Sequence, residues 1–366
     1  MDCMVEHVNV QSPYSKPCAM GQSIIECVPN ISEGRDIEKI NRIVDAARIH
    51  GIKILGIEPD SDYNRTVITF AGKPEDVEKA AYLLIEASIN EIDMRIHSGE
   101  HPRMGCVDVC PFVPISGSSM EDCNEIARRV ASKVALLSVP VFLYGNAASD
   151  PLRSSLSKLR KGEYEGLESR FLGESTSHGV ETSLPDFGST EWSDTVQRSG
   201  AITIGSRGIL IAYNVNIDER DANISKRIGS IVRSSGRLMK SLDADKRFRT
   251  QGLLSHVQGM GVPLESHGLS QVSMNLQEYK QTNLHHAYDV IASLANDMGG
   301  KAIGSEIVGL VPLDSMIEAG QWYSDRDDMT EEELVLLAIN RLGLNSIHQF
   351  NPHERIIEWC LKGEEQ

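Results

Sequence analysis

Several features that mark particular classes of protein are scarce in this sequence. Its 36 Lys and Arg residues are outnumbered by 52 Asp and Glu residues, which gives a formal net charge of −16. Because proteins that hold nucleic acid need clustered positive charge, this deficit argues against nucleic acid as the main partner. No apolar run approaches the roughly 18 residues that a membrane span requires, so we expect no membrane partner.

Cysteine pairs and nucleotide-binding motifs are also lacking. The seven cysteines include no Cys-x-x-Cys, which argues against a disulfide framework or a zinc knuckle. Gly205-Ser206-Arg207-Gly208 lacks the spacing of a dinucleotide loop, and no phosphate loop occurs, so we expect no nucleotide cofactor. Residues 1–22 lack the apolar core and positive start of a signal peptide. The sequence therefore predicts a cytoplasmic protein.

What is present is a repeated order of strand and helix patterns. At roughly 150 residues per domain, the 366 residues correspond to about two domains or one doubled unit. Period-two and helical spacing of apolar residues predict the elements, and Asp36 is expected to cap the first helix. The expected strands cover 23–31, 53–57, 66–70, 106–115, 209–217, 253–258, 271–276 and 302–311, and the expected helices cover 37–50, 75–92, 222–235 and 285–298.

Each half of the chain thus follows the order β-α-β-β-α-β. This order predicts an α+β fold with two ferredoxin-like (βαββαβ) subdomains, in which helices cover one face of each sheet. Between the halves we expect a helix over 119–137, a strand over 139–144 and a polar region over 147–200, and at the end two helices over 331–342 and 352–361. We divide the chain into an N-terminal extension, 1–22, an N-terminal subdomain, 23–206, and a C-terminal subdomain, 207–366.

Residues 93–105 (Asp-Met-Arg-Ile-His-Ser-Gly-Glu-His-Pro-Arg-Met-Gly) carry the densest chemistry in the chain. They place two imidazoles and two guanidiniums between an expected helix and an expected strand, where loops present side chains to a cleft. A solvated connection is the simplest interpretation. Two glycines and Pro102, however, constrain the backbone around His101 more than such a connection requires.

The same residues contain a metal-binding alternative. His97-x-x-Glu100-His101 matches the H-x-x-E-H pattern of inverted zinc peptidases, in which two His one helical turn apart bind the metal. That geometry needs a helix, whereas Ser98-Gly99 is a weak helix interior and Pro102 disfavours the helical conformation at His101. We therefore expect no metal, and a metal assay would test the zinc alternative.

Two further polar junctions accompany this loop. Residues 28–34 (Val-Pro-Asn-Ile-Ser-Glu-Gly) end the first expected strand, and residues 58–66 (Glu-Pro-Asp-Ser-Asp-Tyr-Asn-Arg-Thr) join the second and third. Turn chemistry alone explains Asn, Asp, Pro and Gly at such places, but it does not require Asn64-Arg65 at the start of a strand. Together the three junctions offer acid–base groups, carboxylates for a cation and Arg for an anion.

With these motifs assembled, the chain resembles the glutamate formimidoyltransferase family, the formiminotransferase part of formimidoyltransferase-cyclodeaminase. The matching motifs are Glu26-Cys-Val-Pro-Asn-Ile-Ser-Glu-Gly34, Asn64-Arg-Thr-Val-Ile-Thr-Phe70, Ile92-Asp-Met94, Gly99-Glu-His-Pro-Arg-Met-Gly105, Val107-Asp-Val-Cys-Pro-Phe-Val-Pro114, Pro185-Asp-Phe-Gly188, Leu210-Ile-Ala-Tyr-Asn214 and Asn340-Arg-Leu-Gly-Leu344. The resemblance implies two α+β subdomains joined near residues 205–208, a folate bound in a tunnel between them, and homodimers.

The resemblance also implies a reaction. The family moves a formimino group from N-formimino-L-glutamate to N5 of tetrahydrofolate, its co-substrate, and releases glutamate in histidine degradation. The family's catalytic histidine lies in Gly-Glu-His-Pro-Arg-Met-Gly, which corresponds to His101. One group with a pKa near neutrality can accept the proton from N5 and deliver one to the departing amine, so His101 is expected to be the general acid/base.

Substrate-binding residues follow from the same resemblance. Glu58 aligns with an acidic position of the family and would face the cationic amidinium, while Arg65 and Arg103 are nearest by motif to the carboxylates. The family's folate-contacting stretch carries over at its ends, Gly188 and Gly200, but the residues between them differ from the family. An acidic chain with anionic substrates must concentrate positive potential, and the lining expected is Arg65, Arg95, Arg103, Arg153, Lys158, Arg160, Lys161 and Arg207.

Alternatives remain open at this point. N-formylglutamate or formiminoglycine could be the donor, because few contacts separate these substrates. A non-catalytic folate-binding protein is another alternative, against which the complete His101 motif argues. The chain shows no counterpart of the cyclodeaminase part, so we expect a stand-alone transferase.

Overall fold

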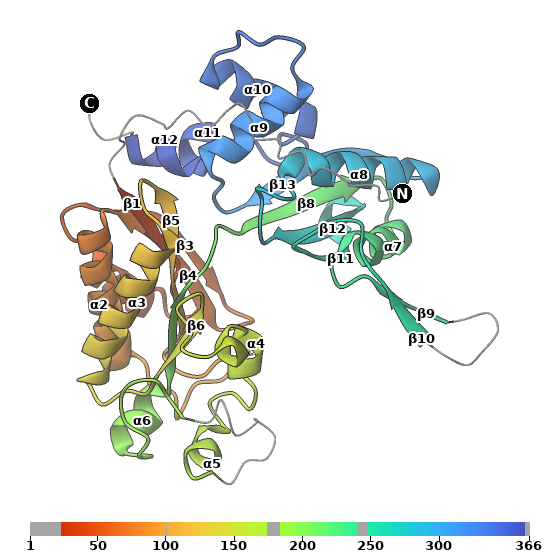
Figure 1. The fold of residues 1–366 in the computed structure, drawn as a ribbon. Coiled ribbons are helices and arrows are strands. Elements are labelled where there is room, and N and C mark those ends of the chain that lie inside the picture. The colour runs from red at the N-terminus through yellow and green to blue at the C-terminus, as the bar shows by residue number, and fades with distance from the viewer. Residues whose placement is uncertain (1–22, 100, 174–183, 241–246, 363–366) are drawn as a thin grey trace, which may run out of the picture.

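The computed structural model describes residues 23–99, 101–173, 184–240 and 247–362 (Figure 1). Helices and strands form two units, each with its own sheet and its own apolar core, joined by residues 207–210. The fold is therefore mixed α+β. The order β-α-β-β-α-β that the sequence predicts in each half is confirmed, with additional elements inserted in both.

The first sheet brings together strands that are distant in the chain. Its strands are β1 (Ile24–Cys27), β2 (Asn30–Ile31), β3 (Ile52–Asp60), β4 (Arg65–Gly72), β5 (Val107–Ser116), β6 (Val141–Gly145) and β7 (Ile202–Ser206). From one edge to the other, β3 is followed by β4, then by β1 and β2, then by β5, β7 and β6. β7 pairs parallel with β5 and β6, whereas the remaining pairs are antiparallel.

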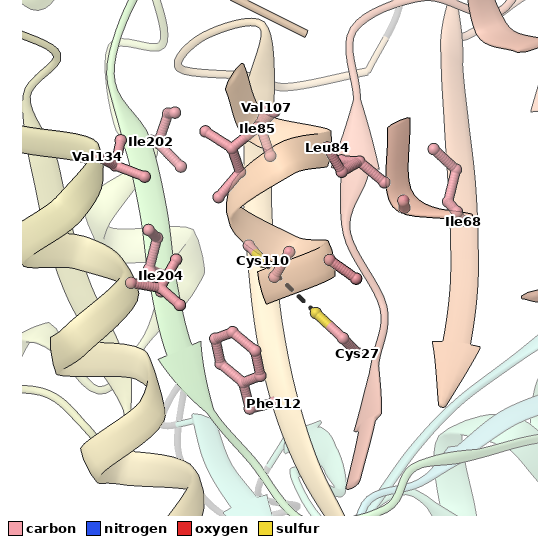
Figure 2. Packing of buried hydrophobic residues seen from close by; sticks show 14 of the residues in the cluster. Cys27, Ile68, Leu84, Ile85, Val107, Cys110, Phe112, Val134, Ile202 and Ile204 are labelled. Atoms are coloured by element: carbon pink, nitrogen blue, oxygen red, sulfur yellow. Dashed lines mark hydrogen bonds between the residues drawn. The ribbon is translucent and has the colours of Figure 1, made fainter. Parts of the chain in front are cut away.

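Three helices cover one face of this sheet. They are α1 (Ile37–Ala47), α2 (Pro74–Glu91) and α3 (Met120–Ala135). The side chain of Asp36 accepts a hydrogen bond from the Lys39 N–H, which confirms the predicted cap of α1. Figure 2 shows the core between helices and sheet, where Leu84 of α2 and Phe112 of β5 are both fully buried.

The other face of the first sheet is covered in part. Two short helices, α4 (Leu156–Leu159) and α5 (Leu167–Phe171), contribute to a small apolar cluster with Phe142 and Tyr144 of β6. A third, α6 (Asp194–Ser199), precedes β7. The region 147–200 was expected to be polar, and its described helices supply a second layer at the β6–β7 edge. In this unit helices are found on both faces of the sheet.

The second sheet has four antiparallel strands. Their order is β11 (Val257–Leu264), β12 (Leu269–Leu276), β8 (Ile211–Ile217) and β13 (Ala302–Val308). Its core is shared with α7 (Asn223–Val232), α8 (Leu284–Asp297), α9 (Leu313–Tyr323) and α10 (Glu331–Leu342), and the chain continues through α11 (Pro352–Arg355) and α12 (Ile357–Lys362). The predicted helix over 331–342 is confirmed.

One strand and one hairpin of the second unit differ from the expectation. The sequence predicts a strand over 253–258, but β11 begins at Val257 and runs through two glycines and a proline, which are poor strand residues. Gly261 is needed there because a Cβ would clash with the backbone of α7 at Lys226. β9 (Arg237–Lys240) and β10 (Arg247–Thr250), which form a separate two-stranded sheet, were not predicted.

Cysteine chemistry agrees with the sequence interpretation. The cysteines that the structure describes, Cys27, Cys106, Cys110, Cys123 and Cys360, are free and buried. The Sγ atoms of Cys27 and Cys110 lie 3.5 Å apart on adjacent strands (Figure 2), a contact of thiols rather than a bond. Among the described helices, none has the length and apolar character needed to cross a membrane.

The first core gives a testable prediction on stability. Replacing the fully buried Leu84 by Ala should lower the free energy of unfolding by about 2–5 kcal/mol, because it removes buried methyl groups and leaves a cavity. Urea unfolding followed by circular dichroism measures this change. Leu136→Ala, at a position that is 85% exposed, is the control and should change stability by less than about 0.5 kcal/mol. Equal effects of the two substitutions would contradict the assignment of Leu84 to the core.

Candidate active site

The three polar junctions singled out in the sequence meet at one end of the first sheet. Ile31, the last residue of β2, pairs with Thr66 at the start of β4 and with Val107 at the start of β5. The turn between β3 and β4, the segment after β2 and the segment before β5 are therefore neighbours. This juxtaposition is what antiparallel pairing around β2 requires.

Asn64 connects these junctions. Its backbone is left-handed, with φ of 50°, a conformation that Asn tolerates better than most residues. Its side chain accepts a hydrogen bond from the Gly34 N–H at 2.9 Å and donates one to the Ser98 carbonyl at 2.9 Å. One buried amide thus holds the segment after β2 and the segment before β5 against the β3–β4 turn.

Two glycines make this close approach possible. A Cβ at Gly34 would clash with the carbonyl oxygen of Asp60, and a Cβ at Gly99 would clash with that of Tyr63. Both glycines therefore serve close packing of backbone against the β3–β4 turn. Residues 97–99 and 101–105 contain no helix. The zinc-peptidase pattern would need a helix there.

His101 lies beside Arg65 in this cluster. Its Nε2 is 2.9 Å from Nη1 of Arg65, which, as a guanidinium nitrogen, donates the hydrogen bond. The Tyr63 ring contacts the imidazole edge-on, with ring centroids 6.1 Å apart. The lone pair of Nε2 is thus occupied, and the imidazole carries its proton on Nδ1.

The surroundings of His101 favour its neutral form. Burial and, after it, the charges of Arg65 and Arg160 lower the pKa of His101 from 6.5 to about 4. Arg103 adds to this effect and Asp60 opposes it. The sequence argument expected a group that titrates near neutrality, whereas the site as it stands holds an imidazole that is unprotonated at pH 7.

Arg65 has no carboxylate partner within the described chain. Its Nε is buried and forms no hydrogen bond with any described group, and its Cζ lies 5.9 Å from the Tyr63 ring centroid. Burial lowers the pKa of Arg65, but the guanidinium remains charged. A half-buried guanidinium that bonds to an imidazole and to no carboxylate among the described residues is suited to bind an anion.

Arg103, in contrast, is already paired. It is 6% exposed and donates hydrogen bonds to Glu163 at 3.2 Å and to Glu165 at 2.6 and 2.9 Å. Its Nε also donates to Nδ1 of His97 at 3.3 Å, and Nε2 of His97 is 3.1 Å from the Asn64 carbonyl. Both nitrogens of His97 are therefore engaged by the protein.

A buried carboxylate that the sequence reasoning missed holds the other side of the site. Asp108 is 1% exposed, forms an ion pair with Arg160 and accepts a hydrogen bond from the Met104 N–H at 3.2 Å. It therefore anchors both the segment that follows His101 and a guanidinium that acts on His101. An acidic residue within the apolar run 106–113 was the available signal, because unpaired carboxylates are rarely buried.

The other residues proposed from sequence lie around this cluster in different ways. Gly200, with φ of 66°, packs against the Met104 carbonyl, next to the His101 segment. Gly188, with φ of 87°, packs against Val139 just before β6. Glu58 lies on β3 with its Oε1 about 4.0 Å from where a Cβ of Gly309 would be, and it therefore points toward the second unit.

Neither Glu58 nor Gly188 forms a hydrogen bond with His101. The structure thus brings together His101, Arg65, Arg103 and Gly200 from the predicted set. Glu100 lies outside the described residues. Within those residues, no group of three or more His, Cys, Asp or Glu side chains is placed to hold a metal.

Taken together, the cluster holds a neutral imidazole among guanidiniums at one end of the first sheet. Two family models match the chain: "Formiminotransferase domain, N-terminal subdomain" over residues 24–207, and "Formiminotransferase domain" over residues 212–362. The chain belongs to the formiminotransferase family.

Known relatives agree with this membership. Glutamate formimidoyltransferases from Thermoplasma acidophilum and Streptococcus pyogenes are 37% and 34% identical, and each match covers 86% of this chain and 96% or 97% of the relative. Formimidoyltransferase-cyclodeaminase from Rattus norvegicus is 39% identical over 94% of this chain. This chain spans only 61% of the length of that longer relative.

The lowered pKa of His101 gives a prediction on pH. The C2–H resonance of His101 should titrate near pH 4, and Arg65→Gln should move the midpoint toward 6.5 because it removes an adjacent positive charge. Because the unfolded imidazole binds a proton near pH 6.5, this histidine should lower stability as the pH falls from 6.5 to 4. NMR titration of both proteins measures the shift, with Arg48→Gln, exposed and distant, as the control. A wild-type midpoint near 6.5 would contradict the geometry.

Asp108 gives a prediction on folding. Asp108→Asn should cost about 3 kcal/mol or more of stability, because it leaves the Arg160 guanidinium without its buried partner. Thermal and urea unfolding measure the loss. Asp45→Asn, which breaks the exposed pair with Arg48, is the matched control and should cost less than about 1 kcal/mol. A loss at Asp108 no larger than that at Asp45 would refute the anchoring role.

Proposed function

We propose that this protein transfers the formimino group from N-formimino-L-glutamate to N5 of tetrahydrofolate, giving 5-formiminotetrahydrofolate and L-glutamate. Tetrahydrofolate is then a co-substrate. Family membership and the names of the full-length relatives support the reaction. The single observation that links this reaction to the site is the hydrogen bond between a neutral His101 and Arg65, a guanidinium suited to bind a carboxylate.

In the proposed mechanism, His101 carries one proton between two nitrogens. N5 of tetrahydrofolate attacks the amidine carbon of formiminoglutamate, and Nε2 of His101 accepts the proton that N5 loses. The imidazolium then returns this proton to the glutamate nitrogen as the bond between that nitrogen and the carbon breaks. No proton is gained or lost overall, and a general acid/base of this kind contributes about 10²- to 10⁴-fold to the rate.

Arg65 connects substrate binding to the state of His101. In the structure, the Arg65 Nη1–H occupies the lone pair of His101 Nε2, so the base is blocked. A substrate carboxylate competes for this guanidinium, because charge-assisted pairs are stronger than a bond to neutral imidazole. Binding would release Nε2 and cancel part of the positive field, which raises the pKa of His101 toward neutrality. The base is thereby freed when a substrate is present.

The remaining residues take supporting roles in this proposal. Arg103 already forms ion pairs with Glu163 and Glu165, so it orders the His101 segment rather than binding a substrate carboxylate. Glu58 points toward the second unit and is a partner for the amidinium or for the folate. Gly188 and Gly200, both with positive φ, shape the backbone of the folate-contacting stretch.

We also propose the finer architecture that the resemblance implies. Each unit is ferredoxin-like, which is supported by the strand orders β3-β4-β1/β2-β5 and β11-β12-β8-β13, in which the first and third strands of each repeat are central. The boundary between the subdomains lies at residues 206 and 207. Folate binds between the subdomains, and the enzyme is a cytoplasmic homodimer.

A coupled assay of glutamate release from formiminoglutamate, dependent on tetrahydrofolate, tests the function. His101→Ala should lower kcat by at least about 10²-fold, because it removes the proton carrier. Tetrahydrofolate affinity, measured by calorimetry, should change by less than about threefold. His50→Ala, an exposed histidine, is the control. Near-normal turnover of the His101 variant would end the proposal, and faster turnover of N-formylglutamate or formiminoglycine would reassign the donor.

A further inference from the structure

Tyr63 stands beside both members of the His101–Arg65 pair, yet the proton transfer proposed above gives it no role. Its ring contacts His101 edge-on, with centroids 6.1 Å apart, and Cζ of Arg65 lies over the same ring, 5.9 Å from its centroid. Tyr63 is nevertheless 46% exposed. An aromatic ring that borders the base and is open to solvent is available to contact a bound substrate.

The turn between β3 and β4 holds Tyr63 in place. The side chain of Asp60 accepts hydrogen bonds from the N–H groups of Asp62, at 3.0 Å, and of Tyr63, at 2.9 Å. The Tyr63 carbonyl packs against Gly99, where a Cβ would clash with it. The backbone at Tyr63 is therefore fixed by contacts on both sides, so the ring needs little ordering when a substrate binds.

Arg65 indicates which kind of group the ring and the imidazole accept together. Its guanidinium is a planar cation with delocalised N–C–N bonds. It lies over the Tyr63 ring, whose face carries negative potential, and it donates a hydrogen bond to Nε2 of His101. A protonated amidine is likewise a planar N–C–N cation with N–H donors. The place that Arg65 occupies thus matches an amidinium in charge, shape and hydrogen bonding.

We propose that Tyr63 is a specificity-determining residue, whose ring face receives the amidinium of the formimino donor once a donor carboxylate has drawn Arg65 away. This inference rests on the proposed function. Asp60, whose charge raises the pKa of both Arg65 and His101, supplies negative charge in the same turn. In this arrangement the amidinium lies with Tyr63 and Asp60, and Glu58 is left to the folate.

The ring distinguishes donors by charge. N-formyl-L-glutamate carries an oxygen in place of the terminal nitrogen of N-formimino-L-glutamate and is neutral at that end. Both donors displace Arg65 with the same carboxylates, so the lost contact between Arg65 and the ring is common to both. Because only the formimino donor places a new cation over the ring, Tyr63 favours it by about 3- to 30-fold, the range of a partly desolvated cation–π contact.

Replacing Tyr63 tests this selectivity in the coupled assay of glutamate release. The selectivity is kcat/KM for formiminoglutamate multiplied by the competitive inhibition constant of N-formyl-L-glutamate. Tyr63→Leu should lower it by about 3- to 30-fold, and Tyr63→Phe, which keeps a ring, should recover most of the loss. Trp322→Leu, at an aromatic residue that is 57% exposed on α9, is the control and should keep the selectivity within about twofold. Circular dichroism checks the folding of each variant.

Fluorinated phenylalanines at position 63 separate the recognition of charge from that of shape. Successive fluorines withdraw electron density from the face of the ring while changing its size little. From phenylalanine to 4-fluoro-, 3,5-difluoro- and 3,4,5-trifluorophenylalanine, the selectivity should therefore fall step by step. A ring that serves only to pack the turn gives no such trend.

The outcomes separate this inference from the proposed function. Unchanged selectivity in Tyr63→Leu, a flat fluorine series, or faster turnover of the formyl donor by the wild type would each overturn the role of Tyr63. If the wild type releases no glutamate from formiminoglutamate in the presence of tetrahydrofolate, the proposed function itself fails, and the inference fails with it.

Discussion

The site depends on the side chain of Asn64, whose amide bonds to two segments that are distant in the chain. It bonds to Gly34 after β2 and to Ser98 before β5, from a left-handed position in the β3–β4 turn. A buried amide that satisfies two backbone groups is costly to replace, since any substitute leaves these groups unpaired. The positions of Arg65, which follows Asn64, and of His101, which follows Ser98 by three residues, are set by these two bonds.

The electrostatics of the cluster follow from an incomplete pairing of charges. Arg160 is paired with Asp108 and Arg103 with two glutamates, and the charges of both still contribute to the lowered pKa of His101. Arg65 is left over and bonds to the imidazole instead. Asp60 and Asp108 act on the charge of Arg65 without forming an ion pair with it, so its guanidinium can still bind an anion. In the proposed reaction, Arg65 is the group that supplies positive charge to an anionic substrate, in a chain whose net charge is −16.

Local sequence signals were sufficient for the β-α-β-β-α-β order of each half, but not for β9 and β10, and the location of the site stays a prediction. The helical spacing and cap of α1 and the polar junctions around His101 are local patterns, and the structure contains them where the sequence indicates. β11 was misplaced because Gly261 is required by the contact with α7, a contact between segments that no local pattern reveals. Asp108 was missed for a similar reason, since its partner Arg160 is 52 residues away. The pKa of His101 depends on guanidiniums from three segments, so it too could not be obtained from one motif.

The burial of the thiols has a practical consequence. Every cysteine that the structure describes is buried, and Cys27 and Cys110 touch one another between β1 and β5. A water-soluble alkylating reagent can reach these two only when the strands separate, so their rate of labelling reports how often the centre of the first sheet opens. Cys360, in α12, reports separately on the last helix. The described cysteines therefore provide probes of local unfolding in both units, without any engineered label.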